Sequence, residues 1–376
     1  MTHNAHDNES IWTDFTGNLR SALSSPPSTK YISGKTLLIT GAGGSIGSAL
    51  ARFATACNPE ALILLDTNEC GLHSLEQSFD ISSTVAHVPI LGSICDSVLL
   101  SELFALYHPQ IVFHAAACKH VPLMETNPLA AASTNILGTN ALLQAASAYG
   151  AEQFIMVSSD KAVMPVSIMG ATKRLAELLL VEHPEKALQQ KAVRLGNVLG
   201  SSGSVGPLFL QQINEGGPVT VTHPDACRFF LTLNHAVTFL MTALSPEYET
   251  GILIPDLGPS RRVEELARHL IAAAGRDHPD IEIIFTGLRP GDKVEELLSS
   301  SYDRVLTQDK DPFSTVRPQR SDAGTLKTAV EEITQSVRQR DLRLLLENIC
   351  KVVPEYQRGP VLQQVVENSC RSEIWK

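Results

Sequence analysis

The sequence has no apolar run that approaches the roughly 18 residues needed to span a bilayer. Its seven cysteines form no CxxC pair and no spacing typical of a zinc site. The cysteine count is odd and no signal peptide is recognisable, which favours reduced thiols in a cytoplasm. We therefore expect a soluble, cytoplasmic protein without a membrane segment, a disulfide framework or a metal site.

Positive charge is also scarce, because 30 Lys and Arg residues face 40 Asp and Glu residues and the formal net charge is −10. This balance argues against broad binding of nucleic acid or of anionic membranes. Internal repeats and low-complexity tracts are absent as well. A chain of 376 residues with 43% hydrophobic residues is long enough for one large α/β unit or two domains with a real core.

A glycine-rich turn is the first informative motif. An apolar strand at 37–39 runs into TGAGGSIG at 40–47, and a helical pattern follows. A strand, a glycine turn and a helix start in this order form the phosphate-binding arrangement of a Rossmann unit, in which the backbone approaches a pyrophosphate and the helix N-terminus supplies N–H donors. The candidate cofactor-binding residues of this motif are Thr40, Gly41, Gly43, Gly44, Ser45, Ile46 and Gly47.

An acidic residue follows the next apolar strand, at 61–65. Asp66 lies 25 positions after Gly41, near the distance expected of the carboxylate that binds an adenosine ribose. No Arg or Lys follows directly in DTNE to receive a 2′-phosphate, so NAD is favoured over NADP. The alternative for Asp66 is a cap at the end of its strand.

Strands and helical patterns then alternate. Further strands are expected at 87–91, 111–113, 154–158 and 192–195. This alternation predicts an α/β fold with a doubly wound parallel sheet. After the strand at 111–113, three small residues would let a cofactor lie close to the backbone, namely Ala115, Ala116 and Ala117.

The alternation breaks at about residue 199, where short mixed segments begin. The parts that we expect are an N-terminal extension (1–34), a NAD-binding Rossmann domain (35–200), a smaller mixed α/β substrate-binding lobe interleaved with it (201–305) and a helical C-terminal extension (306–376). The N-terminal extension has a polar start that we expect to be disordered, followed by an amphipathic helix over 11–23.

Three reactive side chains stand together at the end of the strand at 154–158. Ser159, Asp160 and Lys161 follow this strand, and a helix that begins near Ser167 carries Met169 and Lys173 four residues apart on one face. Ligands of open parallel sheets bind outside the carboxyl ends of the strands. An acid and an amine at this place can carry out proton chemistry on a ligand. The alternative is a solvated turn with an ordinary ion pair.

Six motifs together resemble one family. The chain is similar, from about residue 34 to 298, to extended short-chain dehydrogenase/reductases, and specifically to the CapD-like nucleotide-sugar 4,6-dehydratases of polysaccharide biosynthesis. The motifs are TGAGGSIG (40–47), FHAAACKHVPLMETNP (113–128), SSDKAVMPVSIMGATKRLAE (158–177), RLGNVLGSSGSVGPLF (194–209), PVTVTHPDACRFF (218–230) and GLRPGDK (287–293).

The resemblance implies a redox cycle on UDP-N-acetylglucosamine. NAD takes a hydride from sugar C4, the C5 proton becomes acidic beside the new ketone, water leaves from C6, and the hydride returns to C6. The product is a UDP-4-keto-6-deoxy sugar. The resemblance also implies a homo-oligomer.

The reaction needs an acid and a base, and the family's assignment places them on adjacent residues. Asp160 would protonate the C6 hydroxyl and Lys161 would remove the C5 proton. Burial raises the pKa of a carboxyl group and lowers that of a lysine, which suits both roles. The resemblance also assigns Lys173 to the nicotinamide ribose and Ser159 to the C4 oxygen. Further implied cofactor contacts are Ser93, Ile94 and Asn135.

Two residues depart from the family's usual pattern. Met169 stands where the superfamily has a Tyr, and a thioether cannot abstract a proton, so C4 oxidation needs another base, Asp160 or a water. A Met also occurs in a subgroup of these dehydratases that retains the C5 configuration, and we interpret it as a marker of that subgroup. Ser93 replaces an Asp that holds the adenine amine in many relatives.

Basic residues in the second lobe are candidates for binding the sugar nucleotide. Arg228 and Arg289 lie in loops framed by Pro and Gly, and guanidinium groups suit the diphosphate; the alternative is a surface salt bridge. The other candidate substrate residues are Asn197, Ser204, Val205, Lys119 and His120. For His120 a structural role is an equal alternative.

Two other functions compete with dehydration. One is a nucleotide-sugar epimerase, or a dehydratase that also inverts C5, with the same cofactor. The other is a non-catalytic NAD-binding regulator, which only the missing Tyr supports.

Overall fold

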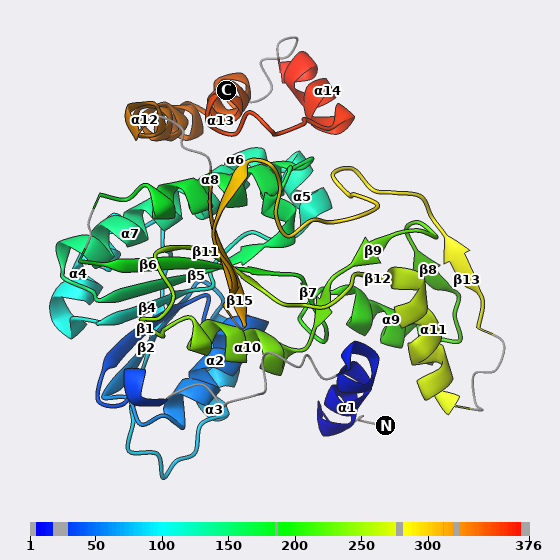
Figure 1. Ribbon diagram of the computed structural model, residues 1–376, viewed down its shortest axis with the longest axis horizontal. Coiled ribbons are helices and arrows are strands. Elements are labelled where there is room, and N and C mark those ends of the chain that lie inside the picture. The colour runs from blue at the N-terminus through cyan, green and yellow to red at the C-terminus, as the bar shows by residue number, and fades with distance from the viewer. Residues whose placement is uncertain are drawn as a thin grey trace.

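The computed structural model describes residues 5–17, 29–184, 187–275, 281–310, 312–318 and 323–369. Its main sheet has nine strands. These are β1 (Thr36–Thr40), β2 (Ala61–Asp66), β3 (Ala86–Leu91), β4 (Ile111–His114), β5 (Gln153–Ser159), β6 (Gln189–Leu195), β11 (Gly251–Pro255), β14 (Asp303–Lys310) and β15 (Phe313–Pro318). Their order across the sheet is β14-β15-β11-β6-β5-β4-β1-β2-β3 (Figure 1).

The strand order reverses at β1, which pairs in parallel with β2 on one side and with β4 on the other. Leu38, for example, lies opposite both Ile63 and Val112. All five residues of β1 are buried, as expected of an apolar strand covered on both faces. The predicted doubly wound parallel sheet is therefore confirmed, with its ligand-binding crevice expected at this reversal.

Helices cover both faces of the sheet (Figure 1). One face carries α2 (Ser45–Thr55), α3 (Glu69–Gln77) and α10 (Leu233–Thr242). The other carries α4 (Ser97–Tyr107), α5 (Val121–Thr126), α6 (Pro128–Ala132), the π-helical turn η2 (Ser133–Gly138), α7 (Thr139–Ala148) and α8 (Ile168–Val181). Helix α8 starts where predicted, because the Ser167 hydroxyl accepts the Gly170 N–H at 3.1 Å.

The second lobe is a smaller mixed unit beside the carboxyl ends of the strands (Figure 1). Its elements are β7 (Asn197–Val198), α9 (Val205–Asn214), β8 (Val219–Val221), β9 (Cys227–Arg228), β10 (Phe230–Leu231), β12 (Arg261–Arg262), α11 (Val263–Ala273) and β13 (Ile283–Phe285). Helix α1 (Ala5–Thr16) packs against this lobe, with Trp12 and Phe15 in its hydrophobic core. Helix α1 begins within the polar start, so the expectation of disorder is wrong for residues 5–10. Residues 1–4 and 18–28, which contain the first residues of the chain and the rest of the predicted helix, lie outside the described residues.

The prediction of a helical extension from residue 306 is wrong for its first part. Strand β15 pairs with β11 and β14 pairs with β15, both antiparallel, so residues 303–310 and 313–318 extend the main sheet. The secondary structure of this segment is set by its pairing with β11, because its own apolar pattern is weak. Helices begin only afterwards, as α12 (Ala323–Gln339), α13 (Leu342–Val352) and α14 (Pro360–Ser369).

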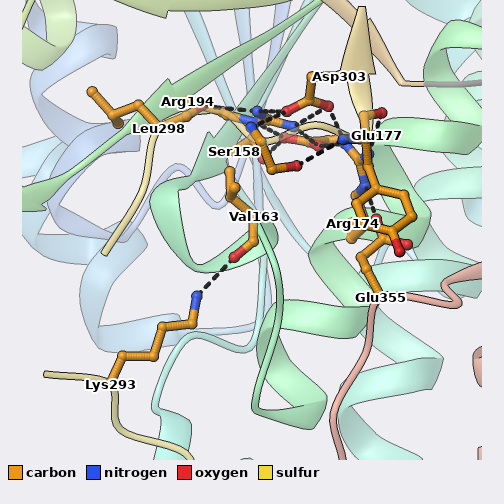
Figure 2. Close-up of polar contacts among 11 residues, drawn as sticks. Ser158, Val163, Arg174, Glu177, Arg194, Lys293, Leu298, Asp303 and Glu355 are labelled. Atoms are coloured by element: carbon orange, nitrogen blue, oxygen red, sulfur yellow. Dashed lines mark hydrogen bonds and ion pairs between the residues drawn. The ribbon is translucent and has the colours of Figure 1, made fainter. Parts of the chain in front are cut away.

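A network of buried ion pairs connects β6, α8, the start of β14 and residue 355 next to the carboxyl end of β5 (Figure 2). Arg194 of β6 donates to both oxygens of Glu177 at 2.8 and 2.7 Å and to Asp303 at 2.7 Å. Arg174 of α8 donates to Asp303 and to Glu355, each at 2.8 Å. We call these five residues the arginine network. Its oxygens also reach β5, because Ser158 donates to Glu177 at 2.7 Å.

The arginine network keeps the carboxylates of Glu177 and Asp303 ionised. Burial alone would raise the pKa of Glu177, but the charge and hydrogen bonds of Arg194, with the charge of Arg174, lower that pKa overall. The pKa of Asp303 is lowered in the same way against the effect of burial. Lowered folded-state pKa values contribute stability above the ordinary pKa of these groups, and this contribution is lost as the pH falls through the lowered values.

Replacing Arg194 should therefore destabilise the protein strongly. We expect Arg194→Met to lower the free energy of unfolding by about 3–5 kcal/mol, because two buried carboxylates lose one of their two guanidinium partners. The matched control is Arg268→Met, since Arg268 is 69% exposed and bonds Glu264 within α11. That change should cost at most about 1 kcal/mol. Urea unfolding of both variants tests this, and equal losses would contradict it.

Candidate active site

A cleft of about 1150 Å³ opens between the carboxyl edge of the main sheet and the second lobe. Most residues singled out from the sequence line it together. They are Gly41, Gly44, Ser45, Ile46, Gly47, Asp66, Ser93, Ile94, Ala115, Ala116, Ala117, Lys119, His120, Ser159, Lys161, Met169, Lys173, Asn197, Ser204, Val205, Arg228 and Arg289. Thr40, Gly43, Asn135 and Asp160 are not among its lining residues.

The glycine turn leaves no room for side chains and fits a dinucleotide phosphate. Gly41 has a φ of +69°, and a Cβ added there would lie 2.6 Å from the Ala116 nitrogen. A Cβ at Gly47 would lie 2.1 Å from the Gly41 carbonyl oxygen. The N-terminus of α2, an 11-residue helix, begins at Ser45 and opens onto the same cleft. Close backbone and a helix N-terminus are the features that bind a pyrophosphate.

Asp66 shapes the glycine turn as well as lining the cleft. Its Oδ2 accepts the Gly43 N–H at 2.8 Å, and its Oδ1 accepts the Asn68 N–H at 2.9 Å. The geometry is therefore compatible with both expectations for Asp66, namely a cap at the strand end and a carboxylate that contacts the cofactor. A carboxylate has about four acceptor positions, so two remain for ribose hydroxyls.

Thr40 and Asn135 lie outside the cleft lining and bond protein groups, and their contact with a cofactor stays a prediction. The Thr40 hydroxyl bonds Nδ1 of buried His114 at 2.8 Å, and the other ring nitrogen bonds Thr139 at 2.8 Å. Asn135 accepts the Cys118 N–H at 2.8 Å and donates to the Cys118 carbonyl at 3.0 Å. Both residues therefore hold the backbone beneath the cleft. Sequence patterns do not reveal such long-range partners.

Ser159, Asp160 and Lys161 form one hydrogen-bonded group at the end of β5. Asp160 is fully buried, and its Oδ1 accepts from the Ser159 hydroxyl at 2.9 Å and from the Lys161 amine at 3.0 Å. Its Oδ2 has no hydrogen-bond partner among the described residues. The Lys161 amine lines the cleft and also donates to the Asn197 side chain at 3.1 Å. The predicted pair is thus an internal one, which argues against a solvated turn.

The expected lowering of the Lys161 pKa is wrong. Burial does act to lower it, but the charges of Asp160 and Glu296 together outweigh burial and raise the pKa of Lys161. The Glu296 carboxylate is buried, with Oε1 3.7 Å from the Lys161 amine. Its Oε2 accepts from Lys293 at 3.1 Å, and Lys293 donates to the Val163 carbonyl at 2.7 Å (Figure 2). A carboxylate of the second lobe therefore holds the ammonium form of Lys161.

Lys173 shows the opposite behaviour. Burial lowers its pKa to about 8, although Glu177 acts in the other direction. Its amine donates to the Val157 carbonyl at 2.7 Å and lines the cleft. Met169 lies one turn earlier on α8, is 3% exposed and also lines the cleft, which leaves an apolar thioether where a proton acceptor would stand.

The two arginines differ in what they can offer a diphosphate. The Arg228 guanidinium donates to three backbone carbonyls, those of Cys227 at 2.6 Å, Val294 at 3.0 Å and Lys293 at 2.8 Å. These bonds make Arg228 a clamp between β9 and residues 293–294 and use three of its five N–H donors. Arg228 also lines the cleft, and its contact with the diphosphate stays a prediction. Arg289 is 59% exposed and bonds Asp292 at 2.8 Å, so its guanidinium reaches the cleft with donors to spare.

Three residues that the sequence analysis did not single out complete the site. They are Glu296, Lys293 and Ser202, whose carbonyl accepts from Lys119 at 2.7 Å. Lys293 is the last residue of GLRPGDK, and Glu296 follows three residues later. A carboxylate so close to a predicted substrate-binding loop is the sequence signal that could have identified Glu296. Burial lowers the pKa of both Lys119 and His120, and for His120 the Lys119 charge adds to the effect.

Neither a metal-binding cluster nor a membrane-crossing helix occurs among the described residues. No group of three or more His, Cys, Asp or Glu side chains there is arranged to hold a metal ion. Within the same ranges no helix combines the length and the apolar character that crossing a membrane requires.

Comparisons with known proteins agree with this geometry. The family model described as "Polysaccharide biosynthesis protein" matches residues 37–318. The probable polysaccharide biosynthesis protein EpsC of Bacillus subtilis is 42% identical over 294 residues, which are 77% of this chain and 49% of that protein. The chain thus spans about half the length of EpsC.

Two further relatives carry the names of specific enzymes. The UDP-N-acetylglucosamine 4,6-dehydratase (inverting) of Campylobacter jejuni is 32% identical over 76% of this chain and 83% of its own length. A UDP-glucose 4-epimerase of Rickettsia canadensis is 32% identical over 79% of this chain and 87% of its own length.

Solved structures support the same grouping. Pen from Bacillus thuringiensis superposes with a TM-score of 0.70 and 30% identity, over 77% of this chain and 90% of Pen. The UDP-glucose 4-epimerase of Thermus thermophilus, solved with NAD, has a TM-score of 0.60 over 70% of this chain and 90% of its own, and its 24% identity shows the shared fold. The match to the family model covers most of the main sheet and the second lobe, and the chain belongs to the polysaccharide biosynthesis protein family, among the CapD-like extended short-chain dehydrogenase/reductases.

Proposed function

We propose that this chain is a NAD-dependent nucleotide-sugar 4,6-dehydratase that converts UDP-N-acetylglucosamine to a UDP-4-keto-6-deoxy sugar. The observation that carries the proposal is the Asp160–Lys161 pair, with Nζ and Oδ1 3.0 Å apart and with Lys161 lining the same cleft as the glycine turn. Dehydration needs an acid and a base on one sugar, and this pair supplies both. The named activity of the C. jejuni relative supports the same chemistry.

NAD is the proposed cofactor. The glycine turn and the N-terminus of α2 would hold its pyrophosphate, and Asp66 the adenosine ribose. Lys173, with its amine in the cleft, would bond the nicotinamide ribose. When bound, the nicotinamide supplies a place that accepts the C4 hydride and later returns it to C6. The name of the T. thermophilus structure, which contains NAD, supports this choice over NADP.

The sugar nucleotide is proposed to lie along the second lobe. Arg289 offers exposed guanidinium donors to the diphosphate. Ser204 and Val205 begin α9, and the N-terminus of this 10-residue helix adds N–H donors and positive dipole. The Ser204 hydroxyl is buried without a partner among the described residues, which suits a ligand contact. Asn197, Lys119 and His120 face the sugar side of the cleft.

The elimination step uses the paired residues at the end of β5. Lys161 acts in its neutral form, which is the minor one because Asp160 and Glu296 stabilise the ammonium form. It takes the C5 proton, the C–H electron pair forms the C5–C6 double bond, and the C6 hydroxyl leaves as water with a proton from Asp160. Oδ1 of Asp160, which is bonded to the Ser159 hydroxyl, is the oxygen that would carry this proton. Lys161, now an ammonium group held by Glu296, returns its proton to C5 when the hydride reaches C6.

Oxidation at C4 proceeds here without a tyrosine. Ser159 bonds Asp160 at 2.9 Å, so a proton from the C4 hydroxyl can pass through Ser159 to the Asp160 carboxylate. This route would also load Asp160 for its later role as acid. Because one lysine removes and returns the C5 proton on one face, we propose retention at C5. Inversion, as in the name of the C. jejuni relative, is the alternative.

A nucleotide-sugar epimerase is the second candidate, favoured by the R. canadensis relative. Incubation of the protein with UDP-N-acetylglucosamine and NAD, followed by mass spectrometry and NMR, separates the two. Loss of one water and a new C6 methyl signal support dehydration, and the C5 proton couplings give the configuration. An unchanged mass with altered sugar stereochemistry would instead support the epimerase.

Removing the base should abolish turnover without unfolding the protein. Lys161→Ala is expected to lower kcat by about two to four orders of magnitude, the usual contribution of a positioned base. Its NAD affinity should stay near that of the wild type. The control is Lys327→Ala, on the exposed side of α12. Near-normal turnover of Lys161→Ala would remove the lysine from the mechanism.

Glu296 should set the pH at which Lys161 becomes active. Glu296→Gln removes a negative charge that stabilises the ammonium form, so the Lys161 pKa falls. Because the neutral amine is the active form, the rising limb of the pH–kcat profile should move to lower pH. Neighbouring Glu295 is exposed, and Glu295→Gln should leave the profile in place. A profile unchanged by Glu296→Gln would contradict this tuning.

The glycine turn should tolerate no methyl group. Gly47→Ala is expected to weaken NAD binding by at least about tenfold, because its Cβ would lie 2.1 Å from the Gly41 oxygen and the turn must shift. Gly359→Ala is the matched control, since its nearest contact would be an ordinary 3.6 Å. Calorimetric titration with NAD measures both. Equal affinities would exclude this turn as the phosphate site.

A further inference from the structure

The N-terminal helix α1 lies outside the residues that the family model matches, yet it is firmly anchored in the second lobe (Figure 1). The Phe15 ring is buried and meets Phe230 edge-on, with ring centres 5.5 Å apart. The Arg261 guanidinium lies 3.8 Å from the centre of the Phe15 ring and also donates to the Phe15 carbonyl. His269 of α11 bonds the Ile11 carbonyl at 3.2 Å.

Trp12 lies one turn before Phe15 on the same helix. It packs against a segment whose other side lines the cleft. It is 6% exposed. A Cβ at Gly200 would lie 2.9 Å from the indole Nε1, and a Cβ at Gly206 would lie 2.9 Å from the indole Cη2. The indole therefore lies against both ends of residues 201–205, which we call the serine turn.

The serine turn contacts the cleft residues on its other side. The Ser202 N–H donates to the Ser45 hydroxyl at 2.9 Å, and the Lys119 amine donates to the Ser202 carbonyl at 2.7 Å. A Cβ at Gly203 would lie 2.5 Å from the His120 ring. The turn continues through Ser204 into α9, whose first residues line the cleft. It is thus held between the indole and the proposed substrate site.

We propose that α1 is a positioning element of the sugar-nucleotide site, acting through Trp12 on the serine turn and so setting the affinity for the nucleoside diphosphate of the substrate. The ligand's identity rests on the proposed function. Gly200 and Gly203 have φ values of +73° and +69°, and glycine loses more backbone freedom when it is ordered than any other residue. Without the indole, binding must order the turn itself, and that cost weakens affinity.

The test compares Trp12→Ala and Trp12→Phe with the wild type. Calorimetry with UDP and with NAD gives the two affinities, and turnover of UDP-N-acetylglucosamine gives KM and kcat. Trp12→Ala should weaken UDP binding and raise KM by about tenfold, while kcat and NAD affinity stay within about twofold. Trp12→Phe keeps an aromatic ring against the glycines and should restore most of the UDP affinity.

A second variant reaches the same contact from the other partner. Gly206→Ala puts a methyl group 2.9 Å from the indole at the start of α9, where alanine is a good helix former. Gly206→Ala should displace the indole and weaken UDP binding severalfold. If Trp12→Ala fails to fold, this variant still tests whether the indole affects UDP affinity. Unchanged UDP affinity in Gly206→Ala would then overturn the inference.

The remaining outcomes separate the inference from the function on which it rests. Equal UDP affinities in Trp12→Ala and the wild type overturn the role of α1 and leave the dehydratase intact. Equal losses of UDP and NAD affinity also overturn it, because α1 would then serve folding in general. A wild-type protein that binds NAD but neither UDP nor UDP-N-acetylglucosamine would overturn the proposed substrate instead.

Discussion

Two buried guanidinium groups fix the position of the strand end that carries the proposed catalytic residues. Arg174 and Arg194 gather carboxylates from α8, from the start of β14 and from residue 355, which lies 181 positions after Arg174. Buried charges are tolerable only when every partner is well placed. The network therefore fixes β6, α8 and the C-terminal segment relative to one another, and Ser158 passes that constraint to the strand end where Asp160 and Lys161 stand.

The sequence predicted what depends on local pattern. The glycine turn, Asp66 and the alternation of strands and helices identified the doubly wound sheet and its cofactor edge, because strand, turn and helix follow one another along the chain. The hairpin of 303–310 and 313–318 was missed because pairing with β11 decides it. The protein partners of Asn135 and Arg228 were missed for the same reason, since Cys118 and Lys293 come from other segments.

The electrostatics of the site follow from a single asymmetry between two lysines. Lys161 faces Asp160 and Glu296, so its ammonium form is stabilised, whereas Lys173 is buried beside a backbone carbonyl and its pKa falls to about 8. Burial alone, the only quantity that a sequence suggests, would have lowered both. The charge of Asp160 makes most of the difference and that of Glu296 adds to it, so the packing of the second lobe against the sheet also affects the protonation of the site.

The position of Glu355 also has a consequence for biosynthesis. Gln357 donates its N–H to the Pro165 carbonyl at 2.9 Å, so this late segment also braces the loop between the catalytic pair and α8. A ribosome delivers residues 355–357 only after every strand of the main sheet. Until then a nascent chain has Arg174 short of one carboxylate and the loop at 165 without its brace. Premature termination after the last strand would therefore leave the Rossmann core present but its reactive end unfinished.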